Sequence, residues 1–168
     1  MKAERGGFRA SRHEQRHEQR LVGFEEDPYK PRRKVRGAAR CADCGAVFRR
    51  GRWSWNATPQ HAVACLCPAC RRIRERLPAG FVTLKGGFFD EHRDEVLKRV
   101  RHCEDAQKRE HPLQRIMAVE ARGGALLVTT TDPHLARRIG EALHRAYKGE
   151  LDYRYNKQDK LLRVSWSR

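Results

Sequence analysis

Long apolar segments are missing from this chain of 168 residues. Hydrophobic residues make up 39% of it and the mean hydropathy is −0.87, which excludes a large core and favours small modules held by a metal or by disulfides. No apolar run approaches the roughly 20 residues that span a bilayer, and the charged N-terminus lacks the apolar centre of a signal peptide. We therefore expect a cytoplasmic protein without a membrane partner.

Motifs of nucleotide-dependent enzymes are also missing. The chain has no GxxxxGK[ST] loop, so the sequence gives no case for ATP hydrolysis. Eight histidines are present, including His111, but none stands at an informative spacing from a second acid or base group. An enzyme that uses these histidines is the alternative, and we expect none.

Acidic residues are scarce, since 21 Asp and Glu face 37 Lys and Arg, giving a net charge of +16. Such a chain attracts polyanions, with nucleic acid as the first candidate and an anionic membrane surface as the second. Basic residues outnumber acidic ones in residues 1–39, 40–76 and 112–168, whereas residues 77–111 carry seven of each. Residues 1–39, which include the repeat RHEQRHEQR, are predicted to be a basic, disordered tail.

Six cysteines indicate metal binding, because thiols stay reduced in the cytoplasm. Two Cys-x-x-Cys pairs stand 22 residues apart, and four thiolates at this spacing form a closed tetrahedral site that favours zinc or an iron–sulfur centre. We predict a structural Zn²⁺ ion in a ribbon over residues 40–76, with the ligands Cys41, Cys44, Cys67 and Cys70. Cys65 is an alternative ligand, although Cys65 and Cys103 fit better as small buried hydrophobic residues than as a redox switch.

The remaining sequence predicts a second domain over residues 90–168, after a linker at 77–89. Apolar residues at helical spacing indicate one helix from Asp90 to about Glu110 and another that begins at Asp132, where the aspartate caps and Pro133 follows. Alternating apolar residues indicate four strands, at 115–121, 125–130, 151–155 and 162–166. The predicted fold class is therefore α+β, with an N-terminal four-cysteine zinc ribbon and an α-β-β-α-β-β domain whose antiparallel sheet has helices on one face and an open second face.

Arginine gathers in three places that suit RNA phosphates. It surrounds two tryptophans in the ribbon, follows the last cysteine on a short predicted helix, and lines the polar face of the second helix. An ordinary solvated face is the alternative for each, and we expect one of the two tryptophans, but not both, to be exposed. The predicted nucleic-acid-binding residues are Arg49, Arg50, Arg52, Trp53, Trp55, Arg71, Arg72, Arg74, Arg137, Arg138, Arg145 and Lys148.

Two stretches resemble a known family. The Cys-x-x-Cys-Gly and Cys-Pro-x-Cys knuckles resemble the N-terminal zinc ribbon of the large-ribosomal-subunit export adaptor called nonsense-mediated mRNA decay protein three, and VTTTDPHLARRIGEALHRAYKG (128–149) resembles the domain after its ribbons. Short bacterial proteins that share this layout, with RIMAVEARGG and ELDYRYNKQDKLLRVSW, look similar over roughly residues 40–168. The adaptors have two sets of knuckles and this chain has one, so the resemblance implies the four metal ligands and an association with ribosomes or RNA, but not export.

The leading functional hypothesis is a zinc-stabilised RNA-binding protein that acts on ribosomes or ribosomal RNA as an assembly or translation-associated factor. A DNA-binding or transcription-associated zinc ribbon is the second hypothesis. A third is a protein-interaction adaptor, in which Arg154 and Arg163 on the open face of the sheet bind an acidic partner. The sequence leaves the oligomeric state open.

Overall fold

The computed structural model describes residues 37–157 and 160–168, which form two sheets and four helices. The predicted tail lies outside the described residues up to position 36, and the first strand already begins at Ala39. Within the described part of the chain, no helix combines the length and apolar character that crossing a membrane requires.

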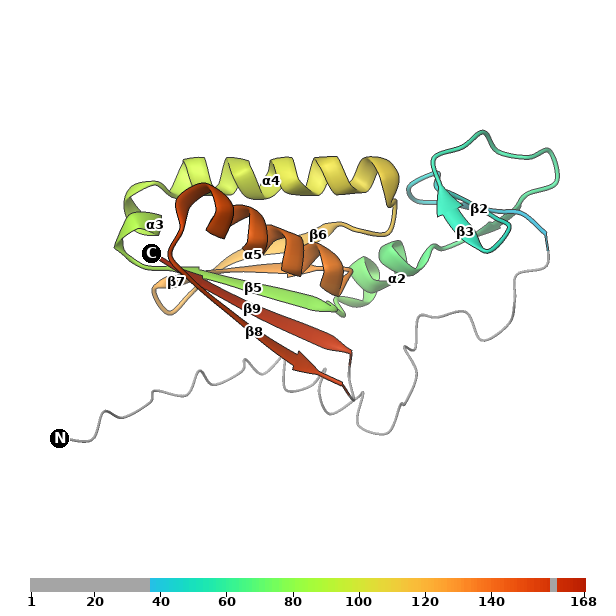
Figure 1. Cartoon of the computed structure of the whole chain (residues 1–168). Helices are drawn as coiled ribbons and strands as arrows, with labels where there is room; N and C mark the ends of the chain where they lie inside the picture. Colours follow the sequence, from blue (N-terminus) through green and yellow to red (C-terminus); the bar gives the residue numbers. More distant parts are fainter. Residues whose placement is uncertain (1–36, 158–159) are drawn as a thin grey trace.

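The ribbon, which we define as strands β1–β4 and helix α2, is built around a four-stranded sheet in the order β3-β2-β1-β4 (Figure 1). β1 pairs antiparallel with β2 and parallel with β4. A two-residue turn, Arg50-Gly51, joins β2 to β3 with positive φ at both positions (51° and 81°), as a tight hairpin turn requires. The strands and the helix run over Ala39–Cys41 (β1), Val47–Arg49 (β2), Arg52–Ser54 (β3), Val63–Cys65 (β4) and Pro68–Glu75 (α2).

The linker predicted at residues 77–89 is wrong, because it contains the central strand of the second sheet. β5 (Gly80–Lys85) lies in the middle of the order β6-β7-β5-β9-β8, and the short helix α3 (Gly87–Glu91) follows it. Four of the six residues of β5, namely Gly80, Phe81, Val82 and Leu84, are buried, and they point to both faces of the sheet. The strand therefore shows no alternation of apolar and polar residues. A short continuous apolar run of this kind carries no periodic signal.

The predicted order of the remaining elements is confirmed, but the sheet is mixed rather than antiparallel. β5 pairs parallel with β9, whereas its pairing with β7 and the two outer pairings are antiparallel. The sheet domain comprises β5, α3 and the elements at Arg93–Glu110 (α4), Ile116–Arg122 (β6), Ala125–Thr130 (β7), Pro133–Tyr147 (α5), Glu150–Asn156 (β8) and Leu161–Ser167 (β9). As predicted, the Asp132 side chain caps α5 by accepting the backbone N–H of His134 at 2.7 Å.

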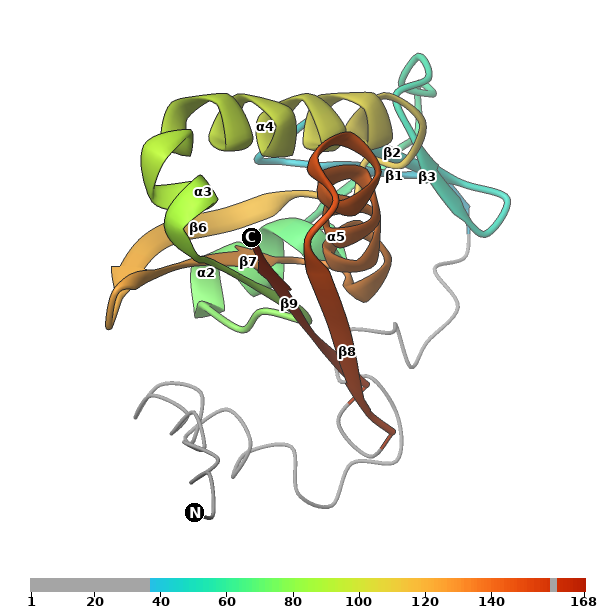
Figure 2. The ribbon, with the colours of Figure 1, turned by 60° about the vertical axis from the view of Figure 1, so that its left-hand side comes forward.

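The main core lies between the sheet and the two long helices, which cover the same face (Figures 1 and 2). Trp166 and Phe89 are its largest fully buried side chains. α5 approaches the sheet closely at Gly140, where an added Cβ atom would stand 2.6 Å from Cγ1 of Val164. The opposite face is less open than predicted, because the alternate positions Phe81, Leu127 and Leu161 are buried in a second small cluster.

Candidate metal centre

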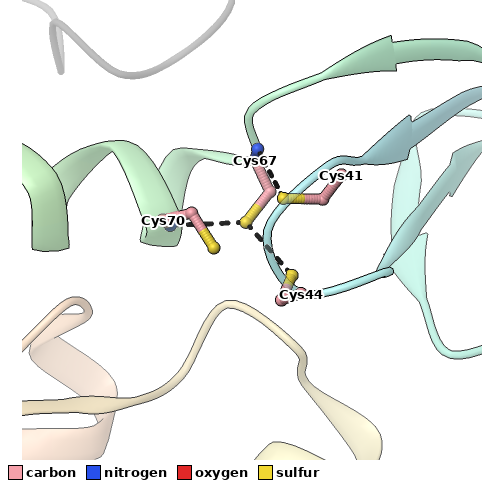
Figure 3. Close-up of side chains that lie close together, drawn as sticks. All are labelled: Cys41, Cys44, Cys67 and Cys70. Carbon is pink, nitrogen blue, oxygen red and sulfur yellow. Dashed lines mark hydrogen bonds between the residues drawn. The ribbon is translucent and has the colours of Figure 1, made fainter.

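Four cysteine side chains from the two knuckles meet where the ribbon adjoins the sheet domain (Figure 3). Cys41 ends β1, Cys44 lies in the turn that follows, and Cys67 and Cys70 lie at the start of α2. Their sulfur atoms are all within 4.8 Å of one another. The prediction that these four residues come together is confirmed.

The spacing of the sulfur atoms suits a four-coordinate metal. With metal–sulfur bonds of about 2.3 Å, a regular tetrahedron has edges of about 3.8 Å. Sγ of Cys44 and Sγ of Cys67 are 3.8 Å apart. Cys41 and Cys67 are fully buried, Cys70 is 5% exposed, and none of the six cysteines forms a disulfide. Such a shell could hold a metal ion, and four sulfur ligands would leave no coordination position for a substrate.

Local backbone structure brings each knuckle into shape. Gly45, with φ of +76°, turns the chain after Cys44 and donates its N–H to the carbonyl of Cys41 at 2.9 Å. Cys67 is the N-cap of α2, since its sulfur accepts the N–H of Cys70 at 3.4 Å, and the intervening Pro68 fits the first helical turn. The N–H of Cys67 donates to the sulfur of Cys41 at 3.3 Å and joins the two knuckles.

The protein environment changes the pKa values of three of the thiols in different directions. Burial raises the pKa of Cys41, but backbone N–H donors, led by that of Cys67, outweigh it and lower the pKa to about 6. Burial also raises the pKa values of Cys67 and Cys70, and for these two thiols it prevails. Before a metal binds, Cys41 is therefore already a thiolate near neutral pH, whereas Cys67 and Cys70 keep their protons.

An arginine from the sheet domain, Arg115, completes the surroundings of the sulfur atoms. Its guanidinium donates to Sγ of Cys44 at 2.9 Å and to Sγ of Cys70 at 3.2 Å, and it lies 3.6 Å from Sγ of Cys67. The side chain is almost fully buried, and burial alone lowers its pKa, but the hydrogen bonds to Cys70 and Cys44 raise the pKa above its usual value. Four thiolates around a divalent cation carry a net charge of −2, and the fixed positive charge of Arg115 offsets half of it.

Arg115 is held rigidly by the loop between α4 and β6. Its Nε donates to the carbonyl of Pro112 at 2.8 Å, and its backbone N–H donates to Oγ1 of Thr131 at 2.9 Å. Leu113 of the same loop packs against the cysteine cluster. Arg115 carries no signal as a site residue in the sequence, because the cysteines it contacts lie 45 to 71 positions away and no local pattern connects them.

The ribbon hairpin and the end of α4 form the walls of an open groove of about 550 Å³. Trp55 contributes to this groove and is 40% exposed, while its Nε1 donates to the carbonyl of Lys108 in α4 at 2.6 Å. Trp53 instead packs on Phe48 and on the cysteine cluster, so one of the two tryptophans is the more exposed, as expected. The charged residues of the groove are Arg49, Arg50, Arg52, Arg109 and Glu110.

The arginines of α2 have three different environments. Arg72 is buried and donates to the carbonyl of Leu77 at 3.0 Å, so its predicted phosphate contact is wrong. The Arg72 side chain caps the C-terminal end of α2. In a run of arginines, the sequence alone does not distinguish such a buried arginine from an exposed one. Arg74 forms a two-pronged ion pair with Asp43 at 2.5 and 2.9 Å, whereas Arg71 is exposed.

The predicted basic residues of α5 are exposed on an element separate from the ribbon hairpin. Arg137 forms an ion pair with Glu141 at 2.8 Å, and Arg138, Arg145 and Lys148 face outward. Cys103 of α4 packs against the main core, where burial raises its pKa, as it does for Cys65 outside the cluster of four. Both observations fit the expected role of these two cysteines as small apolar residues.

No protein-family model, no curated protein and no solved structure matches this chain. The resemblance to the ribosomal export adaptors therefore stays a prediction.

Proposed function

We propose that this chain is a zinc-stabilised RNA-binding protein that associates with ribosomes or ribosomal RNA. All-sulfur tetrahedral ligation favours zinc, and a site with four protein ligands is structural. The buried residues of the ribbon's apolar cluster are three cysteines, Ala46 and Ala69, with only a few half-buried side chains packed around them, which is too small a core to fold alone. The metal would therefore hold the hairpin in place, and the hairpin would contact the RNA.

The observation that carries the proposal is the electrostatic strain at the tip of the β2–β3 hairpin. Arg49 and Arg52 lie directly opposite each other on adjacent strands, and like charges in that position destabilise a sheet by about 0.2–1 kcal/mol. Between them, Arg50 has a left-handed backbone conformation, which costs a side-chain-bearing residue about 1–2 kcal/mol. All three side chains are exposed, and in the described residues none forms an ion pair.

A polyanion would relieve this repulsion. Phosphates in the groove would neutralise the three hairpin arginines and Arg109, and the exposed ring of Trp55 offers a surface for a base. Contacts of this kind position a nucleic acid and read little of its sequence. Shape, rather than sequence, would then select structured ribosomal RNA over duplex DNA.

The test is the salt dependence of binding to a ribosomal RNA fragment, measured by fluorescence anisotropy. Arg49→Gln/Arg50→Gln/Arg52→Gln should lower the slope of log K against log salt by about two, since each phosphate contact contributes about 0.7. Lys98→Gln/Arg99→Gln/Arg101→Gln, on the exposed surface of α4, removes the same charge and should leave the slope almost unchanged. Equal effects of the two triple variants would reduce the binding to net charge and refute a specific site.

The association with ribosomes is tested separately. Lysate sedimented through sucrose should show the wild-type protein with a ribosomal particle, and ribonuclease or the hairpin triple variant should shift it to the top. A wild-type protein found only at the top would remove the ribosome from the proposal. Tighter binding of duplex DNA than of RNA would favour a transcription-associated ribbon instead.

A further inference from the structure

Two tyrosines of the outer strand β8 lie on the helix-covered side of the sheet, yet they are exposed. Tyr153 and Tyr155 pair with Val164 and Leu162 of β9, whose side chains belong to the main core. Tyr153 is nevertheless 39% exposed and Tyr155 is 55% exposed. Leu151, earlier in the same row, packs against the core. α5 therefore covers the start of β8 and leaves its end bare, where the strand diverges from the helix (Figure 2).

Charges of both signs lie beside the Tyr153 ring, and two further cations lie at the end of β8. The guanidinium of Arg137 lies 5.9 Å from the centroid of the Tyr153 ring, and it is also paired with Glu141. Lys157 directly follows β8, Lys160 directly precedes β9, and both side chains are exposed. A polyanion that reaches the tyrosines would meet these cations, and a nucleic acid also carries bases that can stack on the two rings.

Exposed aromatic rings next to cations form a surface on which unpaired bases can stack. Each base stacks on a ring, and the neighbouring cations neutralise the phosphates between bases. Residues two apart on a strand are about 6.6 Å apart, so each ring has room for a base of its own. Duplex RNA keeps its bases stacked on one another and cannot use such rings.

We propose that Tyr153 and Tyr155 form a stacking platform for two unpaired bases of single-stranded RNA, with Arg137, Lys157 and Lys160 as its phosphate contacts. The platform rests on the proposed RNA-binding function and adds a second site, on the sheet domain, to the groove of the ribbon. The two sites differ in their main contacts, since the groove has four arginines and one exposed ring, whereas the platform has two rings side by side on one strand.

The test compares the full-length, zinc-loaded protein with two double variants. Tyr153→Leu/Tyr155→Leu keeps apolar side chains and removes the rings, whereas Tyr153→Phe/Tyr155→Phe keeps the rings and removes the hydroxyls. Fluorescence anisotropy at fixed salt gives the Kd for a uridine 12-mer, an abasic 12-mer and a blunt RNA duplex. Thermal melting checks that both variants fold.

The Leu variant should raise the Kd for the uridine 12-mer at least tenfold, because it removes the rings on which two bases would stack. The Phe variant should stay within about twofold of the wild type. Neither variant should change binding to the abasic strand or to the duplex. Equal affinity of the Leu variant and the wild type would overturn the platform and leave β8 free for an extended peptide. Equal weakening by Leu and Phe would also overturn it, because stacking needs no hydroxyl.

The hairpin triple variant separates this inference from the proposed function. It should weaken binding of all three ligands, because all three carry phosphates. If it weakens all three while the Leu variant weakens none, the proposed function stands and the platform is wrong. If only the Leu variant loses affinity for the uridine strand, the platform stands and the hairpin is not the main site. A wild-type protein that binds none of the three ligands contradicts both.

Discussion

Replacing Arg115 with methionine should weaken zinc binding without unfolding the sheet domain. Methionine keeps much of the buried volume and removes the donors at 2.9 and 3.2 Å from the sulfur atoms of Cys44 and Cys70. Burial raises the pKa of Cys70, so its sulfur accepts from Arg115 with a full negative charge only when a metal is bound, and the loss falls mainly on the metal-bound state. The substitution should therefore appear as reduced affinity for the metal.

The expected magnitude follows from the two short contacts. A hydrogen bond to a charged group contributes about 1.5–3 kcal/mol, and losing an outer-sphere partner of a metal ligand typically reduces metal affinity 10- to 100-fold. The lower figure for a single bond corresponds to about tenfold. Because the metal-free protein loses part of the same interaction with the Cys44 and Cys70 sulfurs, we expect the Kd for zinc to rise 10- to 100-fold rather than by the full sum.

The assay is competition for zinc with a chromophoric chelator at pH 7.5. Arg72→Met provides the matched control, since Arg72 is equally buried (8% against 7% for Arg115) but donates to a carbonyl. The control should lower thermal stability while holding zinc with nearly the wild-type affinity. Arg115→Lys should lie between the wild type and Arg115→Met. Unchanged affinity in Arg115→Met, or an equal loss in Arg72→Met, would refute a specific role for the Arg115 charge.

Three further outcomes follow from the geometry. Zinc binding at pH 7.5 should release at least two protons but fewer than four, because the pKa of Cys41 is lowered to about 6 while the pKa values of Cys67 and Cys70 are raised. The affinity for zinc should therefore rise with pH. Calorimetry in buffers of different ionisation enthalpy measures the number of protons released. Removing the metal with a chelator should open residues 40–76 to trypsin and spare the sheet domain, as mass spectrometry of the fragments would show; uniform digestion would contradict this. Gly140→Ala should lower the free energy of unfolding by about 1–2 kcal/mol, because overpacking of α5 against the sheet outweighs the gain in helix propensity. An unchanged midpoint of denaturation would contradict the close contact between α5 and the sheet.

Local patterns predicted the parts of this protein that are determined locally. The two Cys-x-x-Cys pairs gave the correct cluster, because each pair lies within one turn of the chain and only the meeting of the pairs is a long-range event. Asp132 and Pro133 marked the start of α5. In each case a few neighbouring residues specify the backbone conformation.

Features that depend on partners far along the chain were missed. β5 is a short apolar run whose strand character comes from neighbours on both sides, and its parallel pairing with β9 has no signal in either segment. Arg72 and Arg115 looked like members of a basic population, but one bonds to a carbonyl and the other to sulfur atoms. Composition does not distinguish a buried arginine from an exposed one, so arginines are expected at the surface. The packed structure shows that Arg72 and Arg115 are buried.

The position of β9 in the sheet also sets an order of events during synthesis. Gly80 of β5 is paired with Leu162, 82 positions later in the chain. A growing chain therefore carries the middle strand of its sheet with one backbone edge unpaired until β9 has been made. Exposed strand edges invite pairing with other chains, and long-range parallel pairing forms slowly. Stalling of translation between β7 and β9 would release a polypeptide prone to aggregate, and such a nascent chain is a natural substrate for chaperones.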